Sequence, residues 1–378
     1  MNWLTVGNSI GVLQGHAELI ESRADVPWVS LKAEYAGIGR YPIPTEDKNY
    51  LRNRLLDCEP PQLWRLESPS VVIHRFPNNE LRLFLISEGG NICEHAISQI
   101  WYRFFPFIKE LHGKIRFDIE NCSSTRLDIE LAWMPQSFNY SHFLCDFFAP
   151  WIPFADKQDL LSQLSILTID TWPTWQSQLL QKVGFHKIID GYQSCSTYIL
   201  KPRAVWLPVL SNTLMAQLRL QSWLYKYFSG GDTKYYAQPI ASVFLTRNDH
   251  RSPRVRNACQ IRKLVSSLGG AVVDPVMLSF SEKIKILGGA SSIICEGSGS
   301  MNAVLFSSQN SKVIVLSDPW AISDPLMLDG GFPYTNLISH RIKTVMGESP
   351  KPLLGSPLAS CEFSLAEIRQ HILNSNDQ

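Results

Sequence analysis

The chain of 378 residues is 45% hydrophobic and 18% charged, and its formal net charge at pH 7 is +1. This length and composition predict two globular domains and exclude a long disordered tail. The charge balance excludes a general basic field, so we expect no nucleic acid among the partners.

The first 125 residues predict a β-rich region. Apolar runs at 71–74 and 81–85 indicate strands, separated by Pro-Asn and Gly-Gly turns. Aromatic residues crowd the stretch 101–107. A hydrophobic core is the first interpretation of this cluster, and a surface that stacks on sugar rings is the second.

From residue 127 the pattern changes to alternating strands and helices. Strands are predicted at 127–133, 164–169, 187–189 and 204–207, and helices at 141–148, 174–183 and 212–228. Pro150 and Pro153 are expected to stop the first helix. The Ser-Gly-Gly-Asp sequence at 229–232 is the best candidate for a hinge. We therefore predict an N-terminal domain over 1–230, Rossmann-like over 127–210.

The second half shows the same alternation more clearly. Strands are predicted at 242–246, 271–273, 291–295 and 312–316, and helices at 257–268, 279–287 and 300–306. Ser279 with Glu282, and Ser364 with Glu367, have the spacing of a capping box at a helix start. Strands alternating with helices predict a parallel sheet covered on both faces. We expect an α/β domain over 233–350 and a helical C-terminal segment over 351–378.

The sharpest motif is the segment 293–302, Ile-Ile-Cys-Glu-Gly-Ser-Gly-Ser-Met-Asn. An apolar strand runs into a loop of small residues, and a helix start follows. Backbone N–H groups at such a place bind phosphate or another anion. A tight turn without a ligand carries equal weight. Asn302 stands where a dinucleotide fingerprint has its third glycine, which disfavours a Rossmann dehydrogenase.

Arginines cluster just after the predicted strand at 242–246. Loops at strand ends are where open α/β sheets bind ligands, and the planar forks of arginine suit phosphate oxygens. A solvated basic loop is the alternative. The cluster and its neighbour are Arg247, Arg251, Arg254, Arg256 and Asn257.

A third motif is the segment 139–146, Asn-Tyr-Ser-His-Phe-Leu-Cys-Asp. On a helix, His142 and Asp146 share one face. A histidine oriented by a carboxylate can act as a general base, although a structural hydrogen bond is the commoner role of such a pair.

Other signals are absent from the sequence. No Asp-x-Asp and no zinc-ligand spacing occurs, so we expect neither a metal nor another cofactor. The eight cysteines form no C-x-x-C pair, and no run approaches the roughly 18 apolar residues that span a bilayer. We expect reduced thiols and a cytoplasmic location, and leave open an association with the inner face of a membrane through partners.

Taken in chain order, from the segment 139–146 through the arginine cluster to the segment 293–302, the three motifs resemble the family-61 glycosyltransferases, including bacterial members tied to capsule and surface polysaccharides. The resemblance covers residues 127–320 and is most specific over 272–306, with L-S-F-S-E-K followed by I-I-C-E-G-S-G-S-M-N-A-V-L-F. It implies a GT-B architecture, in which two Rossmann-like domains face each other across a cleft. It also implies an inverting, metal-independent transfer from a nucleotide-sugar, with a UDP-sugar favoured, to a glycan acceptor.

The resemblance further implies that the C-terminal domain binds the donor and that the last helix crosses back to the first domain. Many members carry His-Gly-x-Gly where this chain has Glu296 and the loop that follows. Because a carboxylate repels a diphosphate, we expect Glu296 to accept hydrogen bonds from a ribose or sugar hydroxyl. The catalytic pair is His142 and Asp146, and the donor-binding residues are Arg247, Arg254, Asn257, Glu296, Gly297, Ser298, Gly299, Ser300 and Asn302.

Two alternatives stay open, a non-catalytic scaffold from a different class and a second kind of GT-B enzyme. A non-catalytic scaffold that binds polysaccharide or a partner protein would keep the fold, and the carboxylate of Glu296 is its best support. A nucleotide-sugar epimerase would consume the donor without any acceptor.

Overall fold

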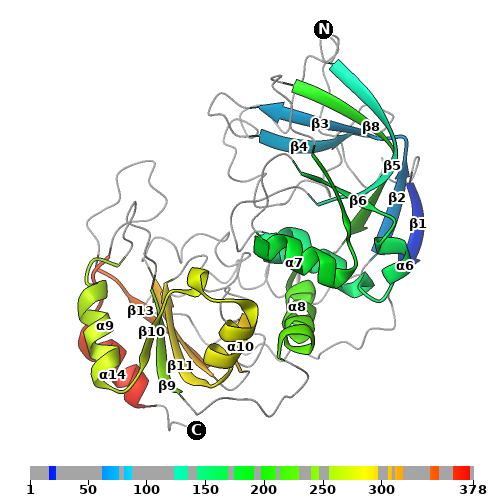
Figure 1. Ribbon diagram of the computed structural model, residues 1–378. Coiled ribbons are helices and arrows are strands. Elements are labelled where there is room, and N and C mark those ends of the chain that lie inside the picture. The colour runs from blue at the N-terminus through cyan, green and yellow to red at the C-terminus, as the bar shows by residue number, and fades with distance from the viewer. Residues whose placement is uncertain are drawn as a thin grey trace, which may run out of the picture. The chain divides into compact units, whose positions relative to one another are not determined.

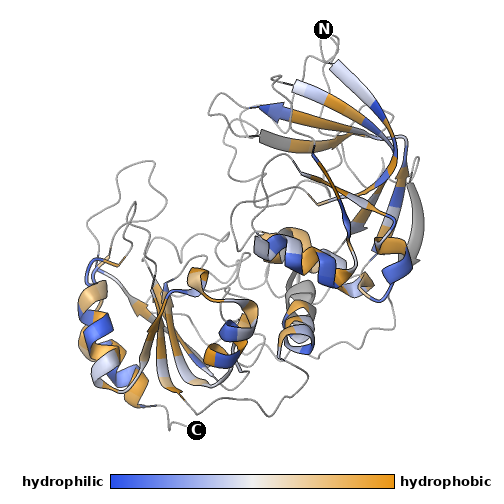
Figure 2. Ribbon diagram, viewed as in Figure 1, coloured by the Kyte–Doolittle hydropathy of each residue, from blue (hydrophilic) through white to orange (hydrophobic). Residues whose placement is uncertain are grey.

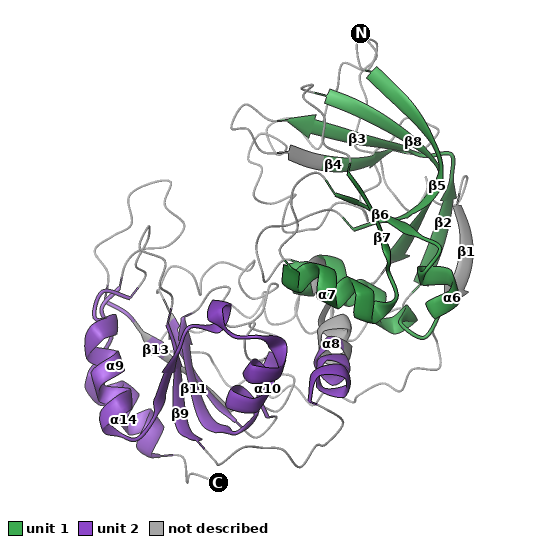
Figure 3. Ribbon diagram, in the orientation of Figure 1, with its two compact units in different colours: residues 1–27, 58–216 green, residues 28–57, 217–378 purple. Residues whose placement is uncertain are grey.

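The computed structural model describes residues 17–22, 62–75, 81–86, 123–134, 143–168, 174–190, 197–209, 213–229, 240–246, 255–296, 305–308, 311–317, 341–348 and 361–374. The chain is a mixed α/β protein with two sheets (Figure 1). It divides into two compact units (Figure 3). Among the described residues, those up to Ala216 form unit 1 and those from Gln217 form unit 2.

Unit 1 is built on one eight-stranded sheet in the order β1-β2-β8-β5-β6-β7. Strands β8, β5, β6 and β7 run parallel, whereas β2 and β3 pair antiparallel with the other edge of β8, and β1 and β4 continue from them. The eight strands are β1 (Ala17–Ser22), β2 (Gln62–Glu67), β3 (Ser70–Arg75), β4 (Leu81–Ile86), β5 (Ser123–Ala132), β6 (Ser165–Thr168), β7 (Lys187–Asp190) and β8 (Thr197–Val209).

The four parallel strands of unit 1 follow a familiar order. Numbered along the chain, they lie as 3-2-1-4, the order of the first four strands in a dinucleotide-binding sheet. The β-rich region that the sequence predicted ahead of residue 125 joins this same sheet through β8. It does so because β8 is 13 residues long and pairs with β3 along its first part and with β2 along its last.

The core of unit 1 lies on the sheet. Its cluster of buried side chains comes from six of the strands and from Trp133, just past β5, and comprises Leu66, Val71, Ile73, Leu83, Leu85, Leu131, Trp133, Leu167, Tyr198, Leu200, Val205 and Leu207. The alternating apolar positions of β3 and β4 place their side chains in this core, as the sequence pattern predicted.

Two prolines do not end the helical segment that follows β5. A π-helical turn, η2 (Phe143–Phe148), continues directly into a 3-10 helix, η3 (Ala149–Phe154). Pro150 lies in the first turn of η3, where a missing N–H costs nothing. Burial of Phe148, Trp151 and Phe154 holds the segment against the unit. The sequence prediction of a helix stopped at Pro150 was therefore wrong.

The helices α6 (Gln158–Leu161) and α7 (Thr174–Val183) complete unit 1. The end of α7 lies where the sequence placed it, because Gly184 adopts a positive φ of 121° there. A side chain at Gly184 would also meet Gln158, whose Nε2 donates to the carbonyl of Val183 at 2.7 Å and caps the helix end.

Unit 2 contains a five-stranded, fully parallel sheet in the order β10-β9-β11-β12-β13. Numbered along the chain this is 2-1-3-4-5, one of the two common doubly wound orders. Its elements are β9 (Ile240–Leu245), α9 (Ala258–Ser267), β10 (Ala271–Val273), the 3-10 turn η4 (Pro275–Met277), α10 (Phe280–Gly288), β11 (Ala290–Glu296), β12 (Lys312–Ser317), β13 (Arg341–Met346) and α14 (Leu365–Leu373).

Helices cover both faces of this sheet, with α9 and α14 on one side and α10 on the other (Figure 1). The apolar stripes of α9 and α14 bury Ile261, Val265, Ile368 and Ile372 against the strands, while polar residues face outward (Figure 2). The capping box predicted at α10 is confirmed: Ser279 accepts from the backbone N–H of Glu282, whose carboxylate accepts from the Ser279 N–H at 2.8 Å. The apolar face of α14 packs against the core of unit 2 through Ile368 and Ile372. The predicted contact of this helix with the first domain stays a prediction.

The boundary between the units falls inside α8 (Thr213–Phe228). Two side chains explain why most of this helix belongs to unit 2. Gln221 donates to the carbonyl of Ser307 at 3.1 Å, and Tyr225 donates to the carbonyl of Phe306 at 2.8 Å. The sequence placed the boundary after the helix, at 230–233, where glycines indicate a flexible link.

Candidate functional site

The strand order of unit 2 marks one edge of its sheet as a ligand site. From β9 the chain moves to β10 on one side, whereas β11, β12 and β13 follow on the other side. Open α/β sheets bind ligands outside the carboxyl ends of the strands at such a reversal. β9 ends at Leu245 and β11 ends at Glu296. Both segments predicted to bind the donor, 247–257 and 296–302, therefore begin at this reversal.

Two polar side chains share one face at this edge. Phe244 and Ile294 are paired on β9 and β11, and both are buried under α9 and α14. Because side chains alternate along a strand, Thr246 and Glu296, two residues further on, lie on the same face. Both are more than nine-tenths buried, with exposed fractions of 6% and 7%.

Arg262 from α9 reaches the end of β9. Its Nη2 donates to Oγ1 of Thr246 at 2.6 Å, and the backbone N–H of Thr246 donates to the carbonyl of Val273 at 2.9 Å. The sequence analysis did not single out Arg262. Its position five residues beyond Asn257, next to the buried Ile261 of α9, is the signal that would have found it.

Glu296 lies next to a thiol with no chemical role. Burial, together with the charge of Glu296, raises the pKa of Cys295 to about 12, so this thiol stays protonated and inert. Cys259, Cys295 and Cys361 are free cysteines. The buried carboxylate of Glu296 is thus the polar group that β11 presents at the edge.

Asn257, predicted to bind the donor, holds two parts of unit 2 together. Its Nδ2 donates to the carbonyl of Phe363 at 2.7 Å, and its Oδ1 accepts from the backbone N–H of Phe363 at 3.1 Å. A bridge between Val255 and Cys361 continues this contact. Both polar atoms of the buried Asn257 amide are therefore engaged within the fold.

Other predicted residues lie outside the described part of the chain: His142, Arg247, Arg254, Gly297, Ser298, Gly299, Ser300 and Asn302. Asp146 belongs to the π-helical turn η2, where only its backbone is described. The turn follows β5, at which the order of the parallel strands in unit 1 reverses towards β8.

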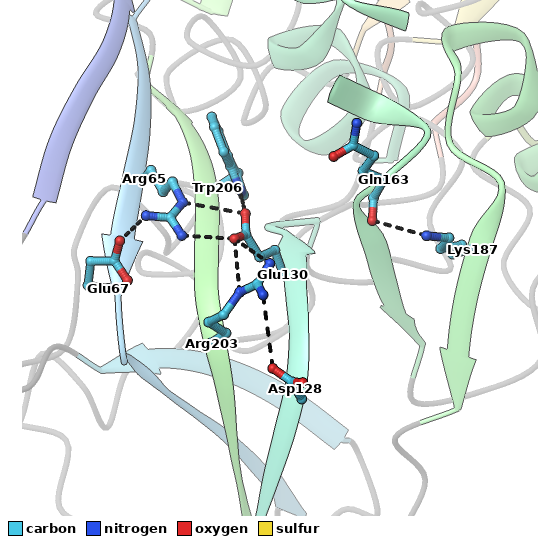
Figure 4. A network of polar contacts seen from close by, with 8 residues as sticks. All are labelled: Arg65, Glu67, Asp128, Glu130, Gln163, Lys187, Arg203 and Trp206. Carbon is cyan, nitrogen blue, oxygen red and sulfur yellow. Dashed lines mark hydrogen bonds and ion pairs between the residues drawn. The ribbon is translucent and has the colours of Figure 1, made fainter. Parts of the chain in front are cut away.

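Unit 1 contains a charged network that the sequence analysis missed (Figure 4). Glu130 on β5 accepts from Nη2 of Arg65 on β2 at 2.8 Å and from Nη2 of Arg203 on β8 at 2.9 Å. Trp206 donates to its other oxygen at 2.6 Å. The Arg65 hydrogen bond, with those of Trp206 and Arg203, lowers the pKa of Glu130 to about 2. This carboxylate is permanently charged near neutral pH and links three strands.

A buried lysine lies on α10 of unit 2. Lys283 is 4% exposed, with its Nζ 5.0 Å from the centre of the Phe280 ring and 5.6 Å from that of Phe306. Burial lowers the pKa of Lys283 to about 8. The aromatic rings stabilise the cation through their negative faces, in part offsetting its desolvation.

Among the described residues, no group of three or more His, Cys, Asp or Glu could hold a metal ion. No helix in the described part of the chain is long and apolar enough to cross a membrane.

Comparison with known proteins finds no family model that matches this chain and no curated protein that matches it. The resemblance to family-61 glycosyltransferases therefore rests on the motifs alone, and the function drawn from it is a proposal.

Proposed function

We propose that the chain is an inverting, metal-independent glycosyltransferase that moves a sugar from a nucleotide-sugar to a glycan hydroxyl, in capsule or surface polysaccharide synthesis. One observation carries the proposal. The strand order of unit 2 reverses between β9 and β11, the two strands that lead into Arg247 and into the loop after Glu296. Motifs chosen from the sequence for anion binding thus follow the strands where physical reasoning expects a ligand.

The two units would form a GT-B enzyme, with the donor on unit 2 and the acceptor on unit 1. Parallel βα strands in both units support this arrangement. The enzyme would work in the cytoplasm, with polysaccharide-assembly partners at the inner face of a membrane.

In the proposed reaction the acceptor oxygen attacks the anomeric carbon from the side opposite the diphosphate. A bond forms between these two atoms while the bond from the anomeric carbon to the diphosphate oxygen breaks. His142, oriented by Asp146, takes the acceptor proton. Arg247, Arg254 and the N–H groups of residues 298–300 stabilise the charge that grows on the diphosphate. Asn302 fixes the loop or reaches the diphosphate.

Donor binding gives the first test. We would measure the thermal midpoint of the full chain with UDP-, GDP-, CMP- and dTDP-sugars in the presence of EDTA. A ligand that binds only the folded state at a hundred times its Kd adds about 2.7 kcal/mol of stability. We expect a clear shift with one nucleotide class, UDP-sugars first. No shift with any donor would contradict the proposal.

The scaffold alternative keeps one supporting observation, the buried carboxylate of Glu296 where many family members have histidine. A donor-induced shift followed by sugar transfer to a glycan acceptor would exclude it. Conversion of the donor sugar to an epimer without an acceptor would favour the epimerase.

A further inference from the structure

Arg262 has an unused hydrogen-bond donor at the edge of the unit 2 sheet. Its Nη2 is engaged with Thr246, but its Nε is buried and has no hydrogen-bond partner. A buried guanidinium N–H without an acceptor is rare in native proteins, and a bound water or ligand is a common explanation. The same helix that positions Arg262 thus leaves one donor available at this edge.

Two arginines of unit 1 show how the same edge of a guanidinium behaves where oxygens are available. Arg65 uses Nε and Nη2 together on the two oxygens of Glu130, at 3.4 and 2.8 Å. Arg203 uses Nε and Nη2 on one oxygen of Glu130, at 3.1 and 2.9 Å. At Arg262, Nη2 donates to Thr246 but Nε has no acceptor, so this edge of the guanidinium can bind one further oxygen.

The neighbouring groups limit the kind of ligand oxygen that can accept from the Nε–H of Arg262. Thr246 and Glu296 lie on the face of the sheet that Arg262 covers, and Glu296 brings a buried carboxylate. A phosphate there would place like charges together in a poorly solvated place. A neutral group that offers an acceptor to the Nε–H of Arg262 avoids that repulsion. The carbonyl groups of a nucleobase and the hydroxyls of a ribose have this character.

We propose that Arg262 binds the nucleoside part of the donor, its Nε–H donating to a neutral base or ribose oxygen. The proposal rests on the proposed function and deepens it, since it adds a residue that would contribute to nucleotide selection. Arg262 differs in this respect from Arg247 and Arg254, to which we assign the diphosphate.

The test separates the nucleoside from the phosphate. We would titrate the full chain with UDP, GDP, dTDP and inorganic pyrophosphate by calorimetry at fixed salt, with EDTA. Arg262→Met keeps most of the side-chain volume but removes the fork, and the exposed Lys263→Met on the same helix is the matched control. We expect Arg262→Met to lower the affinity for the preferred nucleoside diphosphate by about ten- to a hundredfold. Pyrophosphate binding, and all binding by Lys263→Met, should change by less than about twofold.

Several outcomes would overturn the inference. If the wild type binds a nucleoside diphosphate and Arg262→Met binds it equally well, Arg262 is not a ligand residue, and the proposed function stands. If Arg262→Met lost affinity equally for the nucleotide and for pyrophosphate, Arg262 would contact phosphate or have a structural role. Binding of no nucleotide by the wild type would overturn both proposals. Should Arg262→Met lower the unligated thermal midpoint severely, Arg262→Lys, which keeps the charge without the planar fork, gives the same comparison.

Discussion

The two units use their buried charged groups in different ways. In unit 1, the carboxylate of Glu130 is surrounded by Arg65, Arg203 and Trp206, which belong to two other strands. In unit 2, Arg262 keeps one donor without an acceptor, and Lys283 is buried over two aromatic rings. The first arrangement completes its own hydrogen bonds and serves the fold. The second leaves the Nε–H of Arg262 without an acceptor at the edge where ligands are expected.

This difference teaches that charge alone does not identify a site. The charged network of Glu130 lies in unit 1, where Arg65 and Arg203 are in the middle of β2 and β8 and Glu130 is two residues before the end of β5. At the carboxyl edge of unit 2, the guanidinium of Arg262 has one N–H without an acceptor. Variants that separate stability from binding therefore test the comparison directly.

The largest effect is expected at His142. If it is the general base, His142→Ala should lower kcat by about a hundred- to ten-thousandfold and leave donor affinity nearly unchanged. Release of the nucleoside diphosphate in the presence of acceptor gives kcat, and the thermal shift gives donor binding. Arg247→Ala is the contrasting variant, since it should weaken donor binding as well as turnover. Near-normal turnover of His142→Ala would place the base elsewhere.

Glu130→Gln should cause the largest loss of stability among these variants. The change leaves Arg65 and Arg203 without their carboxylate, and we expect the free energy of unfolding to fall by about 3 kcal/mol. Chemical denaturation measures this. The control is Glu67→Gln, because Glu67 is 55% exposed and its ion pair with Arg65 should contribute less than about 1 kcal/mol. A donor-induced thermal shift that disappears in Glu130→Gln would contradict the purely structural role.

The stabilisation by Glu130 depends on pH in a defined direction. The ordinary carboxyl pKa of 4.5 falls to about 2 in the fold, so the folded protein binds this proton less tightly than the unfolded chain. The contribution is complete above pH 4.5 and is lost as the pH falls towards 2. The difference in stability between wild type and Glu130→Gln should shrink over this interval. A difference that stays constant would show that the charge of Glu130 is unimportant.

The sequence predicted well where local signals decide the structure. The capping residues Ser279 and Glu282 locate the start of α10, and Gly184 locates the end of α7, because helix termini depend on neighbouring residues. The carboxyl ends of β9 and β11 were predicted to within one residue, since buried strands end at a change from apolar to polar residues.

Contacts between distant residues could not be predicted in the same way. Glu130 and Arg65 are 65 positions apart, and Asn257 and Phe363 are 106 apart. Nothing in one sequence states which strand pairs with β8, so neither the network of Glu130 nor the joining of the N-terminal strands to its sheet was evident. Strand β13 was missed because its alternating pattern is a weak signal over six residues.

Asn257 tests the boundary between fold and site within unit 2. Asn257→Ala removes both hydrogen bonds to the backbone of Phe363, and we expect the free energy of unfolding to fall by about 2 kcal/mol. Donor affinity, measured by titration, should change by less than about twofold. Asn257→Asp places a buried carboxylate against the carbonyl of Phe363 and should be destabilised at least as much as Asn257→Ala. A tenfold loss of donor affinity in a folded Asn257→Ala would restore the donor-binding role.

Lys283 is expected to give the smallest effect, and of the opposite sign. Because burial lowers its pKa from 10.5 to about 8, the folded protein holds this proton less tightly than the unfolded chain. The resulting destabilisation is complete below pH 8 and disappears as the pH rises to 10.5. Lys283→Met removes this cost but also removes the attraction to Phe280 and Phe306. We therefore expect the free energy of unfolding at pH 7 to rise by only about 1 kcal/mol.

Denaturation of the wild type and Lys283→Met at pH 7 and pH 10 isolates this lysine from the other titrating groups. The advantage of Lys283→Met should shrink or reverse at pH 10, where the wild-type amine is neutral in the fold. The exposed Lys285 on the same helix supplies the control, since Lys285→Met should show no such pH dependence. If Lys283→Met is instead destabilised at both pH values, the ring contacts outweigh the desolvation. The buried cation of unit 2 would then stabilise its fold, as Glu130 stabilises unit 1. The contrast between the units would depend on Arg262 alone.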